Sequence, residues 1–309
     1  MIVATWNGRA LLAEALEGLN GQTLDQFETI VVDDASDDDT VAWLGQTWPH
    51  VRLVALRRRR GLAHALNRGL EAAQGEYIAL LNNDAVPDPD WLAALDAAFE
   101  QSSEVGMLAS RIRLFDVPER LHAAGDFYTL GALPGNRGAW QQDGAPFDLP
   151  VEVFGASAAA AAYRRSLFEA IGQFDEELGM YCEDVDLDWR SQLGGFRCLY
   201  VPTATVRHRL SATAGGPLAS YLVGRNRILV AAMNLPGFVW RRAWLRILVE
   251  QVKISLRALR HIRGEAARAT LRGQVAALPL IWGAWCKGRC RRRQRRVPAE
   301  YIWALLQSS

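Results

Sequence analysis

Three groups of acidic side chains stand where short apolar runs or turns end. Asp33 and Asp34 follow one apolar run, Asp84 follows another, and Glu183 with Asp184 opens a helical pattern after a turn. Carboxylates at the ends of buried strands lie where a sheet opens to a ligand, and there they can hold a metal ion, a hydroxyl group or a proton. The three groups therefore predict one ligand site.

The first two apolar runs end in groups that suit a nucleotide. Thr5, Asn7 and Gly8 offer a hydroxyl, an amide and backbone groups, although an ordinary strand-turn-helix has the same character. Asp33 and Asp34 can accept hydrogen bonds from a base or from ribose hydroxyls, while the acids that follow them are typical of a helix cap. Binding and capping are compatible in this segment.

A basic loop follows the third apolar run. Four arginines, residues 57–60, lead into Gly61 and a helical pattern, and arginine side chains beside a helix N-terminus suit a diphosphate. For each single arginine, a solvated charge run is the alternative interpretation.

Asp84 is the first candidate for a metal ligand. It closes the oxygen-rich turn 82–84, and Mg²⁺ or Mn²⁺ is commonly bound by one or two protein groups together with diphosphate oxygens. A simple Asx turn is the alternative. His208 ends a later apolar stretch, and its imidazole can complete the site with Asp84.

The segment 172–190 carries the strongest signal for acid–base chemistry. Five acids lie between residues 176 and 186, more than the capping of one helix requires. If a helix begins near Glu183, its first acids lie at the positive end of the helix dipole and point into the pocket. Glu183 or Asp184 is then placed to act as a general base.

Alternating strand and helix patterns must position these residues. Alternation of this kind predicts an α/β fold with a mostly parallel sheet. The stretch 115–150, rich in Gly and Pro, predicts a long excursion over the active site. The strands are expected at 2–5, 29–32, 51–56, 77–81, 105–112, 151–162 and 196–201, and the helices at 9–19, 40–47, 62–73, 89–100, 165–171, 183–193 and from about 218 onward.

The 309 residues are enough for one large domain, and their net charge of +1 hides a strong asymmetry. Residues 241–296 hold 16 Lys and Arg against two acids, whereas the rest holds 19 against 32. Four cysteines without a regular framework, and no secretory signal, predict a reducing, cytosolic setting. Cys286 and Cys290 are half of a possible metal site, with an inert pair as the alternative that we favour.

In their order and spacing these motifs resemble the family 2 glycosyltransferases over residues 1–235. The family has the GT-A fold, a Rossmann-like α/β sheet flanked by helices, uses a divalent cation, and inverts the configuration at the anomeric carbon. The turn 82–84, the segment 181–187 and Arg225-Asn226-Arg227 most resemble its rhamnosyltransferase-type branch. Asn82 departs from the family, because many relatives carry an Asp there. The matching motifs are Thr5-Trp6-Asn7, 32–36, 61–63 with Asn67 and Gly69, 81–84, Phe174-Asp175-Glu176, 183–187 and His208.

The resemblance implies a role for each matching residue. Asp184 would deprotonate the acceptor hydroxyl, with Glu183 beside it, and Asp84 with His208 would bind Mg²⁺ or Mn²⁺. Trp189 and Gly155 would contact the acceptor. The implied donor-binding residues are Thr5, Trp6, Asn7, Asp33, Asp34, Gly61, Asn67 and Asn83.

The resemblance also implies partners. The donor would be a nucleoside-diphosphate sugar, either a dTDP- or a UDP-sugar, with rhamnose among the candidate sugars. The acceptor would be a glycan or a lipid-linked acceptor in cell-surface polysaccharide synthesis. Residues 236–309 form a basic helical extension in which apolar residues and arginines interleave, which is typical of helices on an anionic membrane. We expect a peripheral protein on the cytoplasmic face of the membrane, and no nucleic-acid partner, since the acidic front half would repel a polyanion.

Two alternatives remain from the sequence. In the first, a non-catalytic scaffold of the same fold would use the basic tail for membrane or nucleic acid. In the second, the extension is a helical cap on the catalytic domain with a solvated basic face. A nucleotidyltransferase is less compatible, because the chain has no Gly-rich basic signature near its first strand.

Overall fold

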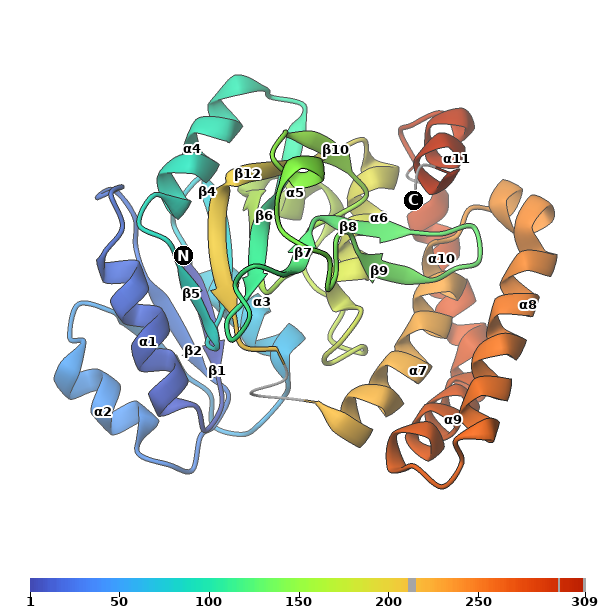
Figure 1. The fold of residues 1–309 in the computed structure, drawn as a ribbon, viewed down its shortest axis with the longest axis horizontal. Helices are drawn as coiled ribbons and strands as arrows, with labels where there is room; N and C mark the ends of the chain where they lie inside the picture. The colour runs from blue at the N-terminus through green and yellow to red at the C-terminus, as the bar shows by residue number, and fades with distance from the viewer. Residues whose placement is uncertain (211–214, 294, 308–309) are drawn as a thin grey trace.

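A ten-stranded mixed β-sheet forms the centre of the molecule, with helices on both of its faces (Figure 1). This computed structural model describes residues 1–210, 215–293 and 295–307. The strand order is β10-β12-β6-β11-β4-β1-β2-β3, with β5 paired to β12 and β7 paired to β6. Strands β8 and β9 form a separate hairpin.

The strands of the central sheet are β1 (Ile2–Thr5), β2 (Ile30–Asp33), β3 (Arg52–Ala55), β4 (Tyr77–Asn82), β5 (Ala85–Pro87), β6 (Val105–Leu114), β7 (Leu121–Ala124), β10 (Val151–Val153), β11 (Ala160–Arg164) and β12 (Arg197–His208), and the hairpin is β8 (Asp126–Tyr128) with β9 (Pro134–Asn136). The α-helices are α1 (Arg9–Asn20), α2 (Thr40–Thr47), α3 (Leu62–Ala72), α4 (Trp91–Gln101), α5 (Arg165–Ile171), α6 (Glu183–Gly194), α7 (Gly216–Asn234), α8 (Gly237–Arg260), α9 (Glu265–Ala277), α10 (Ile281–Arg293) and α11 (Ala299–Gln307). Two 3-10 turns, Ala145–Phe147 and Leu278–Leu280, complete the described elements.

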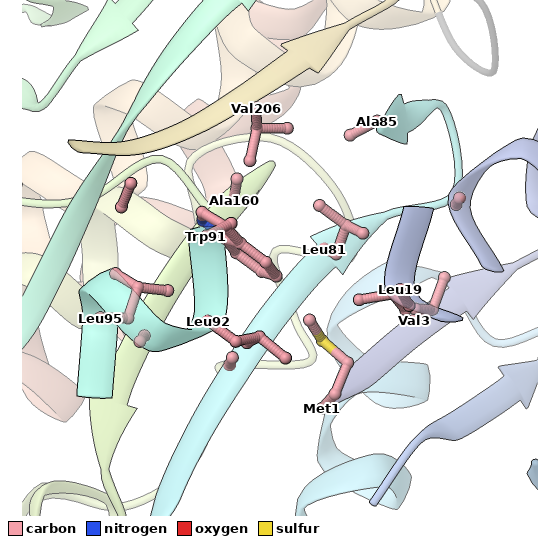
Figure 2. Close-up of a cluster of buried hydrophobic side chains, with 14 of the residues drawn as sticks. Met1, Val3, Leu19, Leu81, Ala85, Trp91, Leu92, Leu95, Ala160 and Val206 are labelled. Carbon is pink, nitrogen blue, oxygen red and sulfur yellow. The ribbon is translucent and has the colours of Figure 1, made fainter. Parts of the chain in front are cut away.

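Each face of the sheet has its own hydrophobic core. Val3 of β1 points into the core under α1 and α4, whereas its neighbour Ile2 points into the core under α3. Because both faces are buried there, the parallel strands β4, β1 and β2 are nearly continuous apolar runs without alternation, whereas the edge strand β3 is partly exposed. Figure 2 shows the first core, in which Trp91 of α4 lies near Leu81 and Val206.

Helices α7–α11 pack together beside the sheet, on the right of Figure 1. A third core joins them to the rest of the protein, since Trp189 of α6, Leu229 of α7, Ile247 of α8 and Ile302 of α11 belong to one buried cluster. The basic extension expected from residue 236 onward is therefore helical, and it packs against the sheet domain.

The predicted α/β fold is confirmed, with differences in detail. The sheet is mixed, because β11 runs antiparallel between β4 and β6. The stretch 115–150 is not only loop, because it contains β7, β8 and β9. The helix expected from residue 89 begins at Trp91, where the side chain of Gln22 accepts a hydrogen bond from the Leu92 N–H and takes the place of a local cap.

Candidate active site

A pocket of about 710 Å³ opens where β1 and β4 end and α6 begins. Its volume lies within the range of roughly 300–1,000 Å³ that is common for small-molecule sites. Segments far apart in sequence meet in it. Its lining includes nine of the residues predicted as functional, namely Thr5, Trp6, Asp34, Gly61, Asn83, Asp84, Glu183, Asp184 and His208.

The ends of β1 and β4 form one wall of the pocket. The Asn83 side-chain amide donates to Thr5 Oγ1 at 3.0 Å, and both groups are buried. Gly8 is required by this close approach, since a Cβ there would lie 2.4 Å from Asn83 Nδ2. The two polar side chains are thus fixed before any ligand arrives.

Asp34 holds the basic loop against this wall. Its carboxylate accepts hydrogen bonds from the backbone N–H groups of Arg60 at 2.7 Å and Gly61 at 2.8 Å. The Arg59 guanidinium lies 3.3 Å from the centre of the Trp6 ring, and both residues line the pocket. The loop therefore presents an arginine and an aromatic ring to the space expected for the donor.

Three residues predicted to bind the donor do not line the pocket. Asn7 is exposed and bonds to Ser36 and Asp37, while the buried Asp33 carboxylate accepts from the Ser36 N–H at 2.9 Å. The buried Asn67 instead donates to Phe174 O at 3.0 Å. These side chains shape loops around the pocket, and direct contact with a donor stays a prediction for them.

Both residues predicted to contact the acceptor lie outside the pocket lining. Trp189 is fully buried and packs edge-on against Tyr128 and Phe154 in the third core. Gly155 leaves room for Asp188, because a Cβ at Gly155 would lie 1.9 Å from Asp188 Oδ2. The structure thus gives both residues a packing role.

Strand pairing brings His208 to Asp84. The end of β12 pairs with β5 so that His208 stands opposite Ala85, and the Arg209 N–H donates to Asp84 O at 2.9 Å. As a result His208 Nε2 lies 3.0 Å from Asp84 Oδ1, although 124 residues separate them. The sequence predicted this pair, and the register explains it.

The Asp84–His208 pair fits a divalent cation. Two ligand atoms at right angles and about 2.1 Å from Mg²⁺ are roughly 3.0 Å apart, which matches the observed separation. The Asn82 side-chain amide lies 3.5 Å from His208 Nε2, so that it is a neutral neighbour where an Asp would add charge. Among the described residues, no group of three or more His, Cys, Asp or Glu could hold a metal ion, and diphosphate oxygens would have to supply further ligands.

His122 lies beside the Asp84–His208 pair and was not identified from the sequence. Its Nδ1 lies 3.1 Å from His208 Nδ1, and the two rings stack with centres 4.8 Å apart. Burial, followed by the neighbouring His208, lowers the pKa of His122 to about 4, so its imidazole is neutral at ordinary pH. No local pattern marked this histidine, because β7 reaches the site only through its pairing with β6.

Asp184 lies in the first turn of α6 and lines the pocket. Its carboxylate accepts hydrogen bonds from the Val185 N–H at 2.8 Å and the Ala158 N–H at 3.4 Å. Burial raises the pKa of Asp184, and more strongly that of the adjacent Glu183, whose Oε2 is buried without a hydrogen-bond partner. A carboxylate with a raised pKa at a pocket wall is suited to accept a proton.

Further acids surround Asp184. Asp126 of the β8–β9 hairpin lines the pocket and accepts a hydrogen bond from the Asn136 amide at 2.8 Å. Burial, followed by the charge of Asp184, raises the pKa of Asp126, and burial likewise raises that of Asp188. The excursion 115–150 does reach the pocket as predicted, yet its polar contributors, His122, Asp126 and Asn136, were not identified from the sequence.

Comparisons with known proteins agree with this geometry. The family model described as "Glycosyl transferase family 2" matches residues 1–172, more than half of the chain. The chain belongs to glycosyl transferase family 2. The prediction of a glycosyltransferase with the GT-A fold is thereby confirmed.

Two curated relatives and one solved structure illustrate the similarity. An N-acetylglucosaminyl-diphospho-decaprenol L-rhamnosyltransferase of Mycobacterium tuberculosis is 26% identical over 88% of this chain and 95% of its own length. An uncharacterised protein of Sinorhizobium fredii is 31% identical over 70% of this chain, which spans only 25% of that protein. A mannosyltransferase of Pyrobaculum calidifontis, solved with GDP-Man and Mn²⁺, superposes with a TM-score of 0.56 at 21% identity, covering 99% of this chain and 83% of the other.

In the glycosyltransferase, the turn before α6 has an unusual backbone conformation. Tyr181 and Cys182, just before α6, both have left-handed backbone angles, with φ of 64° and 65°. Asn226 of α7, fully buried, donates to three carbonyls of this turn, those of Leu178, Met180 and Tyr181, at 2.7–2.9 Å. Residues other than glycine keep a left-handed backbone conformation only where the surrounding structure enforces it. The motif 225–227 thus supports the turn that aims Asp184.

Two further features that the sequence singled out in the glycosyltransferase are its cysteines and its apolar helices. Its four cysteines are free, with Cys182 and Cys198 buried and Cys286 and Cys290 exposed. None of the helices in the described ranges has the length and apolar character needed to cross a bilayer.

Proposed function

We propose that this glycosyltransferase moves a sugar from a nucleoside-diphosphate sugar to an acceptor hydroxyl, with inversion at the anomeric carbon. One observation carries the proposal: a carboxylate with a raised pKa, Asp184, lines the same pocket as the Asp84–His208 pair. A single displacement requires one base for the attacking hydroxyl and one means of stabilising the departing diphosphate. The pocket offers both.

The reaction would run in one step. As the acceptor oxygen attacks the anomeric carbon, its proton passes to Asp184, and the bond from that carbon to the diphosphate oxygen breaks. The nucleoside diphosphate leaves with the electron pair of that bond. A divalent cation, when bound, offsets the charge that develops on the diphosphate. Asp84 and His208 would hold the cation, and the loop with Arg59 and Gly61 would lie along the phosphates.

Burial of the Asp184 carboxylate would keep it basic enough for this role, because burial raises its pKa. Glu183 and Asp126 are also buried with raised pKa values, so both favour the neutral form and would leave Asp184 as the base. Thr5 at the end of β1 and Asn83 just after β4, joined by a hydrogen bond, would face the nucleoside.

The rhamnosyltransferase relative supports a finer proposal for substrates. Its name gives a lipid-linked diphosphate sugar as acceptor, and it aligns over nearly its whole length with this chain. We therefore propose that the donor is a dTDP- or UDP-sugar, with rhamnose as the first candidate for the transferred sugar. The proposed acceptor is a lipid-linked molecule or a glycan in cell-surface polysaccharide synthesis. The corresponding location is the cytoplasmic face of the cell membrane, with the protein bound peripherally.

The decisive experiment replaces Asp184. We expect Asp184→Asn to lower sugar transfer about 10²–10⁴-fold, the usual contribution of a general base, because the amide cannot take the hydroxyl proton. Donor binding, followed as a thermal shift with a series of nucleoside-diphosphate sugars with and without Mn²⁺, should be retained. The matched control is Glu104→Gln, since Glu104 is 72% exposed and far from the pocket lining.

The outcomes separate the alternatives. Unchanged turnover in Asp184→Asn would remove Asp184 from the role of base. A wild-type protein that binds no nucleoside-diphosphate sugar in the same series, and transfers none, would favour a non-catalytic binding protein of this fold.

A further inference from the structure

Helix α8 carries a second apolar face that no part of the described protein covers. Its inward face holds Val239, Ala243, Ile247 and Ala258, all buried. The opposite side carries large apolar residues three or four positions apart, and with 3.6 residues per turn they form one stripe along the helix. This outer stripe consists of six residues that are 41–57% exposed: Leu245, Leu248, Val249, Val252, Leu256 and Leu259.

A row of cations borders the outer stripe. At 100° per residue, five basic side chains of α8 lie about 60–120° round the helix from Leu245, along one edge of the stripe. All are exposed, and Glu250, the one acid of α8, is paired with Lys253 at 2.7 Å. The bordering residues are Arg242, Arg246, Lys253, Arg257 and Arg260.

The pairing of an aliphatic stripe with a basic border selects one kind of partner. Soluble monomers rarely expose contiguous apolar patches of this kind. Nucleic acid would match the cations but not six aliphatic side chains, whereas the interface of an anionic bilayer takes both, with the stripe in the acyl boundary and the cations at the headgroups. Trp244, which is 56% exposed beside the stripe, is a residue type enriched at that interface.

We propose that the outer stripe of α8 docks the protein on an anionic phospholipid surface. This assignment sharpens the general expectation for the basic extension. Ile247 and Ile254, two further apolar residues of α8, lie outside the stripe, because Ile247 packs inside the protein and Ile254 is half-buried.

The docking helix is connected to the pocket. Gly131, in the turn between β8 and β9, lies against α8, since a Cβ on Gly131 would be 2.7 Å from Glu250 Cγ. Figure 1 shows the β8–β9 hairpin extending toward α8. The strands of this hairpin supply Asp126 and Asn136 to the pocket. A protein docked through α8 would hold this wall of the pocket near the lipid surface. The benefit for a lipid-linked acceptor rests on the proposed function, but the docking itself does not.

Vesicle flotation of the full chain tests the docking. Phosphatidylcholine vesicles with and without phosphatidylglycerol are used in the absence of donor and acceptor, so that the result is independent of activity. We expect the wild type to float with the anionic vesicles. The variant Leu248→Gln/Leu256→Gln should bind these vesicles on the order of tenfold or more weakly, because two leucine side chains no longer insert into the lipid. The matched control is Trp140→Gln/Leu149→Gln, two apolar residues of the sheet domain that are 58% and 73% exposed.

A second pair of variants tests the charges. Arg242→Gln/Arg260→Gln should lose about tenfold or more of the binding to anionic vesicles, since each basic residue near the surface contributes about 1 kcal/mol. Arg57→Gln/Arg58→Gln removes two exposed arginines of the basic loop and should float like the wild type. Melting temperatures equal to that of the wild type show that the variants are folded.

Three outcomes would overturn the proposal. The wild type could remain free in the presence of anionic vesicles, or the stripe variant could float as well as the wild type. Alternatively, sedimentation velocity could show a dimer that the stripe variant dissociates while neither protein floats. In that last case a second copy of the chain, and not lipid, covers the stripe.

Discussion

At the scale of single residues, the contact between His122 and His208 bears on the proposed cation site. For His208 Nε2 to offer a lone pair, the ring proton must be on Nδ1. That Nδ1 lies 3.1 Å from His122 Nδ1, so His208 donates only if His122 accepts. A neutral His122 can accept, and its lowered pKa keeps it neutral. We infer that His122 positions His208 by fixing its tautomer.

This role predicts different results for two substitutions of His122. His122→Phe keeps a ring but loses the acceptor, and we expect Mn²⁺ to bind about 10–100-fold more weakly, as is typical when a partner of a metal-binding histidine is lost. His122→Asn can place its amide oxygen near the position of Nδ1 and should keep most of the affinity. The measurement is a Mn²⁺ titration without substrate, followed by electron paramagnetic resonance. Equal loss in both variants would show that His122 only fills space.

At the scale of elements, the turn before α6 links α7 to catalysis. Asn226→Ala would remove the side-chain donor from the carbonyls of Met180 and Tyr181, whereas Leu178 O keeps a hydrogen bond from Arg225 at 3.2 Å, and an unsatisfied buried polar group costs about 1–3 kcal/mol. We expect a loss of stability of that order, together with a lower kcat, because the turn no longer fixes Asp184. Denaturant unfolding and steady-state kinetics are the measurements.

The control for Asn226 lies on the same helix. Ser220→Ala removes an exposed hydrogen bond to Gly216 O within α7 and should change neither stability nor kcat appreciably. Asn226→Asp keeps the volume but cannot donate to carbonyls, so it should be at least as damaging as Asn226→Ala. A stable and fully active Asn226→Asp protein would refute the role of the clamp.

The buried carboxylate of Asp188, which lies against Gly155, predicts a pH dependence of stability. Burial, followed by the charges of Asp126 and Asp184, raises the pKa of Asp188 in the folded protein. The group therefore stabilises the fold fully below the pKa of an unfolded Asp, about 3.9, and this contribution is lost as the pH rises through the folded pKa. Asp188→Asn cannot titrate, so its melting temperature should fall less than that of the wild type between pH 5 and pH 8. Glu104→Gln, an exposed control, should follow the wild type, and parallel curves for Asp188→Asn would contradict the assignment.

The sequence predicted what local pattern determines. Polar residues after apolar runs identified Thr5, Asp84 and Asp184, because strand ends and helix starts are encoded by neighbouring residues. His122 and Asp126 were missed, because only the pairing of β7 with β6 and the fold of the β8–β9 hairpin bring them to the pocket. The family resemblance implied that Trp189 contacts the acceptor, whereas the structure buries its side chain in the third core.

At the scale of the whole molecule, the basic C-terminal part serves two surfaces. The charges of α8 face solvent, whereas two cations of α10 face the acidic sheet domain. Lys287 and Arg291 both contact the buried Asp175, and Arg291 also reaches Asp186 of α6 at 2.8 Å. Burial raises the pKa of Asp175, but these two cations outweigh that effect, so the net pKa is lowered. The extension and the catalytic helix are thus held together by ion pairs.

Replacing Arg291 tests this connection. Arg291→Met should destabilise the protein by roughly 1–3 kcal/mol, below the roughly 3–5 kcal/mol of a completely broken buried pair, because Arg190 still contacts Asp186 and Lys287 still contacts Asp175. The stability lost should be larger at pH 7 than in acid, because the contribution of Asp175 is lost as the pH falls through its lowered folded pKa. Arg289→Met, an exposed cation on the same helix, is the control and should unfold like the wild type. If Arg291→Met unfolds at the same denaturant concentration as Arg289→Met, the ion pairs do not hold α10 to α6, and hydrophobic packing alone joins the extension to the sheet domain.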